Sequence, residues 1–134
     1  MSGKQRKPPR KDYTRLIYAG EVFRVEFLVA PGGHCLAKEW LEAQPLKIQN
    51  KFGMLFKVMG DQGKIRSEQK FKHLAGSDQI FEFKADSGRV LSFFFIDRRI
   101  ILTNGFSKKS KKTPKGEIER AEALKQYFLS KALT

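Results

Sequence analysis

The sequence predicts an α+β fold: a small antiparallel-type sheet in β-α-α-β-β-β-α order, with an N-terminal helical hairpin and a C-terminal helix. Three patterns support this class. Apolar residues alternate over residues 22–29, and they recur at helical spacing over 35–59 and 118–132. Between residues 80 and 102, short apolar segments are separated by turns. The 134 residues fit one domain, since domains usually hold about 100–200 residues. We therefore expect a basic N-terminal arm over residues 1–20 and a single domain over residues 21–134.

The first half of the domain is predicted to hold one strand and two helices. Residues 22–29 alternate as a half-buried strand does, and Pro31-Gly32-Gly33 ends that strand. A short helix is expected from Cys35 to Gln44, before Pro45. A stripe at i, i+4, i+7, i+8 and i+11 predicts the second helix: Ile48, Phe52, Leu55, Phe56 and Met59. These two helices form the expected hairpin on the sheet.

The second half is predicted to hold three strands and the last helix. The strands cover residues 80–84, 89–96 and 99–102, and their connections are short enough to require antiparallel pairing. The unbroken apolar run Phe93–Ile96 predicts a strand covered on both faces. Thr113 is expected to cap, and Pro114 to begin, an amphipathic helix that runs to the C-terminus.

The charge of the chain predicts a polyanionic partner. Lys and Arg number 27 against 14 Asp and Glu, a net charge of +13. Much of the excess lies in residues 1–20 and in the five lysines of residues 107–116, whereas the rest of the chain is nearly balanced. Concentrated basic segments of this kind are typical of nucleic-acid binding. One cysteine, no apolar run long enough to span a membrane and no secretory signal predict a cytoplasmic protein without membrane contact.

The sequence lacks the common catalytic motifs, and the remaining candidate for a site is a group of Lys and Arg residues. The chain has no Gly-rich phosphate loop, no nucleophile elbow and no metal-ligand spacing, so we expect no metal and no cofactor. Lys84 and Arg89 are expected to be hairpin neighbours, and Lys108 and Lys109 follow the last strand, so that all four converge on one sheet edge. Such cations can neutralise the phosphorane that forms when an RNA 2′-hydroxyl attacks the adjacent phosphate.

Other interpretations of the same residues stay open. A Lys-rich loop is commonly a solvated segment, and Lys or Arg at strand ends commonly protects a sheet edge. His73 fits an ordinary surface histidine, and Tyr127 fits a packing residue of the last helix. Composition and spacing alone therefore predict a basic α+β domain that binds nucleic acid.

A longer pattern resembles a known family. The segments Phe71–Gly76, Ile80–Lys84 and Arg89–Phe94 precede the block 105–114 with sequence GFSKKSKKTP, which Glu117-Ile118 and Ala121 follow. This pattern resembles the phage-derived, HigB-like branch of the RelE/ParE toxin superfamily. The resemblance implies a type II toxin that cleaves mRNA on the translating ribosome until a protein antitoxin, expected to be a helix-turn-helix protein, neutralises it.

The resemblance also implies roles for particular residues. Arg89 matches an arginine that holds the scissile phosphate, Lys108 and Lys109 match paired lysines, and Lys84 stands where arginine is commoner. We thus expect Arg89, Lys84 and Lys109 to be catalytic. The expected substrate-binding residues are Lys108, Lys111, Lys112 and Lys72, with Tyr127 and His73 as further candidates. The alternatives are a ParE-like gyrase inhibitor and a non-enzymatic nucleic-acid binder.

Overall fold

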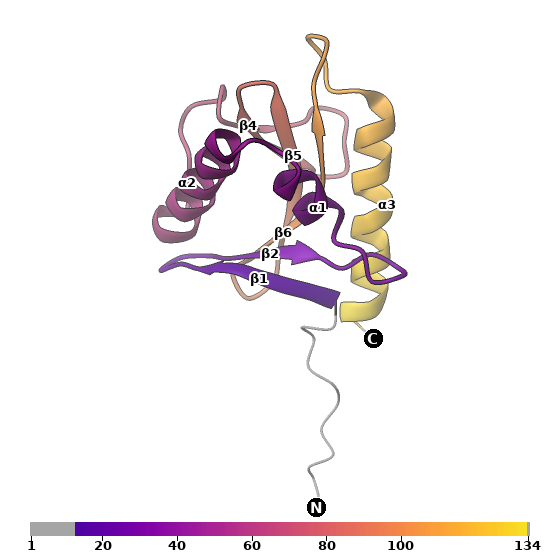
Figure 1. Cartoon of the computed structure of the whole chain (residues 1–134). Coiled ribbons are helices and arrows are strands. Elements are labelled where there is room, and N and C mark those ends of the chain that lie inside the picture. The colour runs from indigo at the N-terminus through magenta and orange to yellow at the C-terminus, as the bar shows by residue number, and fades with distance from the viewer. Residues whose placement is uncertain (1–12, 134) are drawn as a thin grey trace, which may run out of the picture.

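The computed structural model describes residues 13–133 and has the α+β class that the sequence predicts (Figure 1). Its elements are β1 (Thr14–Ala19), β2 (Arg24–Leu28), α1 (Leu36–Glu42), α2 (Leu46–Gln62), β3 (Phe71–His73), β4 (Phe81–Ala85), β5 (Gly88–Phe95), β6 (Arg99–Ser107) and α3 (Lys115–Ala132). The predicted element order was wrong in two places, because β1 and β3 were not expected. Within the described residues, no helix is long and apolar enough to cross a membrane.

The sheet is larger than the small sheet predicted, and it is mixed. Its six strands lie in the order β1-β2-β6-β5-β4-β3. The pairs β4–β5 and β5–β6 are antiparallel, as the short connections predicted, and β3 also pairs antiparallel with β4, whereas β2 runs parallel to β6. The chain between β2 and β6 contains two helices and three strands, which is ample length for parallel neighbours. The prediction of an antiparallel-type sheet was therefore wrong at this pair.

Strand β1 consists of residues that the sequence analysis assigned to the basic arm. It pairs with β2 at one edge of the sheet, and its Tyr18 hydroxyl donates a hydrogen bond to the Asp61 carboxylate on α2, 2.7 Å from Oδ2. Directly after β1 the chain passes close to α2: a Cβ on Gly20 would lie 2.2 Å from the backbone of Gly60. The folded domain thus includes Thr14–Ala19, and the rest of the predicted arm, residues 1–12, lies outside the described residues.

Helices cover the sheet on both faces. One core lies between the sheet and α1 and α2, and it contains Phe52, Phe56 and Met59 of α2 against Phe83 of β4. The other core lies between the sheet and α3, where the ring of Phe128 contacts Phe93 and Phe95. We call these two sides the α2 face and the α3 face. In Figure 1, α2 and α3 flank the strands on opposite sides.

Helix α3 begins at the end of the sheet that carries the β4–β5 turn. Pro114, not Thr113, is its N-cap residue, and no side chain caps the helix. The prediction for Thr113 was wrong because its hydroxyl donates to Glu82 Oε2 on β4, at 2.5 Å. A second anchor is Asn104 of β6, whose amide donates to Glu117 Oε1 at 3.0 Å. The first turn of α3 is thereby fixed to the sheet by two polar contacts.

Candidate anion-binding site

The β4–β5 hairpin places two predicted site residues side by side. Lys84 and Arg89 are directly paired across the hairpin. Between them the chain turns at Asp86, whose φ of 53° lies in the left-handed region that Asp tolerates better than most residues. Lys51 of α2 holds this turn, with its ammonium 2.9 Å from Asp86 Oδ1, and that hydrogen bond lowers the pKa of Asp86 from its usual 3.8. The hairpin neighbours are thus the ones the sequence predicted.

The Arg89 guanidinium is folded back over its own turn. Its Nη1 donates to the carbonyl oxygens of Asp86 and Gly88, each at 2.8 Å. Its Nε is buried and has no hydrogen-bond partner among the described residues. A buried donor without a partner is uncommon, since it loses its hydration without a replacement. The guanidinium therefore retains capacity to donate to an anion.

Glu82 is a buried carboxylate beside this arginine, and the sequence analysis did not single it out. It is 1% exposed, accepts the hydrogen bond from Thr113, and has Oε1 at 3.8 Å from Arg89 Nε. The contact to Arg89 is an ion pair without a hydrogen bond, because the two atoms are too far apart. Glu82 therefore neutralises part of the local charge and ties α3 to the site, while it leaves the donor of Arg89 unsatisfied.

Two further lysines complete what we call the cationic cluster: Lys72, Lys84, Arg89 and Lys108 around Glu82. Lys72 is the cross-strand partner of Glu82, and the backbone N–H of Lys108 donates to Ser87 in the turn at 2.7 Å. Burial lowers the pKa of Lys84 from its ordinary 10.5, and the charges of Lys72, Arg89 and Lys108 lower it further against the opposing effect of Glu82. Four cations face one carboxylate, so the cluster has a net positive charge and attracts anions.

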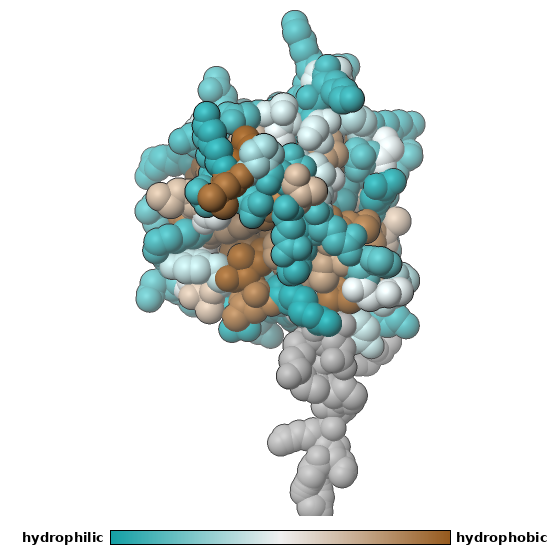
Figure 2. Space-filling model, in the orientation of Figure 1, coloured by the Kyte–Doolittle hydropathy of each residue, from teal (hydrophilic) through white to brown (hydrophobic). Residues whose placement is uncertain are grey.

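The remaining predicted lysines lie in the loop between β6 and α3. Lys109, Lys111 and Lys112 are exposed and form no ion pair with any residue in the range 13–133. Figure 2 shows hydrophilic residues projecting at the top of the molecule, where this loop lies in Figure 1. Lys109 is thus exposed, whereas Lys84 and Arg89 are half-buried. These lysines are placed to contact an extended polyanion rather than one enclosed group.

Two candidates of the sequence analysis lie apart from the cluster. Tyr127 is on the C-terminal half of α3, with Lys131 Nζ 5.8 Å from its ring centroid. At a rise of about 1.5 Å per residue, it lies roughly 18 Å along the helix from Lys115. His73 lies on edge strand β3, where its ring packs 5.1 Å from that of Phe81. Since side chains alternate along a strand, His73 is on the α2 face and Lys72 is on the α3 face.

Within the described residues, no three of the side-chain types His, Cys, Asp and Glu gather where a metal ion would be held. The groups at the cluster are ammonium, guanidinium and carboxylate. Together they can bind a phosphodiester by charge and by hydrogen bonds, and they can donate and accept protons.

The fold and the cluster define a basic α+β protein with a candidate anion-binding site at one end of the sheet. No curated protein matches the chain. The family model described as phage-derived protein Gp49-like (DUF891) matches residues 39–126, which is more than half of the chain and includes the whole cationic cluster. The chain belongs to this family, which is linked to RelE/ParE-like toxins of toxin–antitoxin systems.

Proposed function

We propose that the protein is a HigB-like type II toxin that cleaves mRNA on the translating ribosome without a metal ion. The observation that carries this proposal is the cationic cluster, in which Arg89 has a buried donor without a partner beside three lysines and one carboxylate. Membership of a family linked to toxin–antitoxin systems supports the toxin role and an antitoxin partner. The helix-turn-helix character of that antitoxin is part of the proposal.

In the proposed reaction, the 2′-hydroxyl oxygen of a ribose attacks the adjacent phosphorus and the bond to the 5′-oxygen breaks. The products are a 2′,3′-cyclic phosphate and a 5′-hydroxyl, so the proton lost by the 2′-hydroxyl is balanced by the one gained by the 5′-oxygen. Arg89 neutralises the phosphorane, because its charge is permanent and its fork fits two phosphate oxygens. Lys84 is the proposed proton-transfer group, since its pKa is lowered toward the pH at which the reaction would take place. Lys109 is proposed as a second phosphate contact or acid at the reacting phosphate. The flanking phosphates are proposed to be held by four further lysines: Lys72, Lys108, Lys111 and Lys112.

The test is induced expression of the wild-type chain and of Arg89→Ala, followed by mapping of mRNA 5′ ends. We expect cleavage in the wild type and a loss of about 100-fold or more in the variant, as for removal of one donor that stabilises a developing anion. Arg66→Ala is the matched control, because Arg66 is exposed and outside the cluster. Intact mRNA with inhibited supercoiling would instead select the gyrase-inhibitor alternative. RNA binding without cleavage would select the non-enzymatic one.

A further inference from the structure

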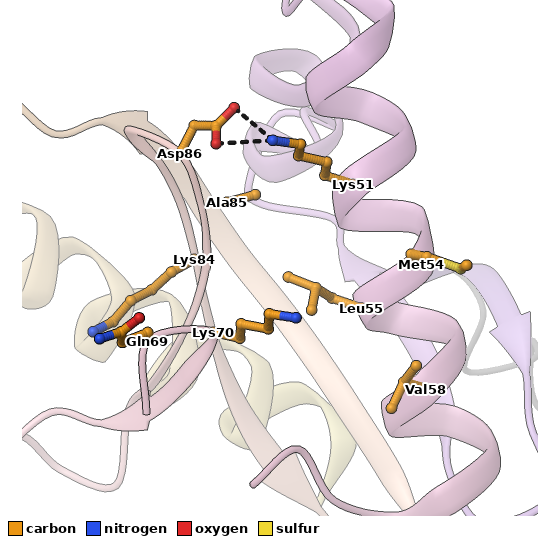
Figure 3. Close-up of a pocket in the computed structure, with 9 residues that line it drawn as sticks. All are labelled: Lys51, Met54, Leu55, Val58, Gln69, Lys70, Lys84, Ala85 and Asp86. Carbon is orange, nitrogen blue, oxygen red and sulfur yellow. Dashed lines mark hydrogen bonds and ion pairs between the residues drawn. The ribbon is translucent and has the colours of Figure 1, made fainter. Parts of the chain in front are cut away.

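A cavity of about 470 Å³ lies between α2 and β4, next to the cationic cluster (Figure 3). Its size falls within the range of about 300–1,000 Å³ that is typical of small-molecule sites. The proposed function does not use it. Its α2 wall is apolar, with Leu55 and Val58 half-buried there, and its rim carries Lys51, Lys70 and Lys84.

The lysines at the rim are not equivalent. Lys51 is paired with Asp86, whereas Lys70 is exposed and forms no ion pair with a described residue. In Figure 3 the Lys70 ammonium extends toward Leu55, so an uncompensated positive charge stands against an apolar wall. This combination suits a ligand that has both a flat apolar surface and a negative charge. A nucleotide has these two features, in its base and its phosphate.

Lys84 connects the cavity with the cationic cluster. It lines the cavity, yet its ammonium and the side chain of Gln69 point together away from α2 in Figure 3. On that side the charge of Lys84 interacts with Lys72, Arg89 and Lys108. The side-chain amide of Gln69 forms no hydrogen bond with a described residue, whereas its backbone N–H donates to Ser67 Oγ at 3.2 Å. The cavity and the cluster therefore lie on opposite faces of the sheet, at the end of β4 that carries Lys84.

We propose that the cavity binds the base of the nucleotide next to the phosphate held by the cationic cluster, and thereby selects the sequence that is cut. This inference rests on the proposed function, because it takes RNA as the ligand of the cluster. Leu55 and Val58 would contact the face of the base, and Lys70 a phosphate oxygen.

The experiment uses the full chain with ¹³C-labelled valine methyl groups, observed by NMR. The chain has five valines, of which Val25 and Val90 are buried in the core and serve as references, while Val58 reports on the cavity. The probes are the four ribonucleoside 5′-monophosphates, with ribose 5-phosphate and inorganic phosphate as ligands without a base. We expect the ring current of at least one nucleotide to shift Val58 while the two references stay fixed, and we expect no such shift from ribose 5-phosphate.

A charge-reversal pair tests the rim. Lys70→Glu should weaken nucleotide binding roughly 5-fold or more, since it replaces an attractive charge by a repulsive one. Lys64→Glu is the matched control, because Lys64 is exposed in the same segment and does not line the cavity. Both positions are exposed, so both variants should fold.

The outcomes separate the inference from the proposed function. If Val58 is unmoved by all four nucleotides, or moves equally with ribose 5-phosphate, the cavity does not bind a base, even where mRNA is cleaved. If an acidic apolar peptide shifts Val58 and nucleotides do not, the cavity is a protein-docking site and the inference is wrong. If Val58 responds to nucleotides but mRNA is never cleaved, the proposed endoribonuclease fails while the base site stands.

Discussion

The cationic cluster makes a quantitative prediction about how salt affects RNA binding. Binding to single-stranded nucleic acid releases counterions, so log affinity falls with log salt by about 0.7 for each phosphate neutralised. We expect Arg89→Ala and Lys108→Ala each to reduce this slope by about 0.7, because each removes one cation from a cluster that contains a single carboxylate. The prediction concerns the slope and not the affinity alone, since affinity also responds to lost packing.

The structure sets the expected size of the effect. If all four cations of the cluster contact phosphates, a fourfold rise in salt weakens binding about 50-fold through the cluster, and each contact accounts for a factor of about 2.6. Glu82 reduces the field of the cluster but does not hold Arg89 by a hydrogen bond, because Nε is 3.8 Å from Oε1. Arg89 is thus free to exchange this carboxylate for a phosphate.

The assay is fluorescence anisotropy with a labelled single-stranded RNA from about 50 to 200 mM salt, a range in which the slope is measurable. Lys38→Ala is the control, because Lys38 is an equally basic surface residue whose ammonium is paired with Glu42 at 2.9 Å. Its substitution should leave the slope unchanged. An Arg89→Ala slope equal to that of the wild type would refute the assignment of a phosphate to Arg89.

Two further perturbations test the fold and the site. Gly20→Ala should destabilise the domain by about 1–3 kcal/mol, because its Cβ would meet the backbone of Gly60 at 2.2 Å. Gly53→Ala is the control: Gly53 lies in open space on α2, the helix that contains Gly60, and its substitution should stabilise the domain by up to about 1 kcal/mol. Urea unfolding measures both variants, and equal stabilities would contradict the close packing of the chain after β1 on α2. The pKa of Lys84 is lowered in the folded protein, so folding favours its neutral form, and the wild type should gain stability relative to Lys84→Met as the pH rises through that pKa toward 10.5. Urea unfolding between pH 7 and 10.5 gives the difference in free energy of unfolding between the two proteins. A difference that falls over this range would show that the pKa is not lowered.

The elements that the sequence predicts well are those whose periodicity is long or whose turns are tight. Helix α2 and strands β4 to β6 are confirmed for this reason. The prediction that Phe93–Ile96 is covered on both faces was wrong, because Phe94 is 38% and Ile96 60% exposed and β5 ends at Phe95. Strand β1 was missed because its apolar residues do not alternate cleanly and because it follows a basic segment that suggested an arm. Strand β3 has only three residues, too few for a period to be visible. The parallel pairing of β2 with β6 is set by long-range packing, on which local patterns carry no information.

The basic residues of the candidate site could be predicted from the sequence, but the buried polar residues that lie between them and α3 could not. The pairing of Lys84 with Arg89 follows from hairpin register, which local sequence determines. Glu82 gave no signal because an acidic residue on a strand is ordinarily solvated, and only the start of α3 buries it through Thr113. Asn104 is likewise buried where the pairing of β5 with β6 is irregular, and sequence analysis did not locate that irregularity.

The arrangement of the hairpin explains how a small domain can hold an arginine ready for an anion. Among the described residues, the Arg89 guanidinium donates two hydrogen bonds, both to carbonyl oxygens of its own turn, so the position of the turn fixes the position of the charge. That turn is held from the α2 face, by the ion pair of Lys51 with Asp86 and by Gly88, where a Cβ would lie 2.7 Å from the Trp40 ring. The α2 face therefore positions a cation that lies beside Glu82 on the α3 face. Preorganisation of this kind lowers the cost of ordering the side chain when a phosphate binds, since the guanidinium is already fixed before the ligand arrives.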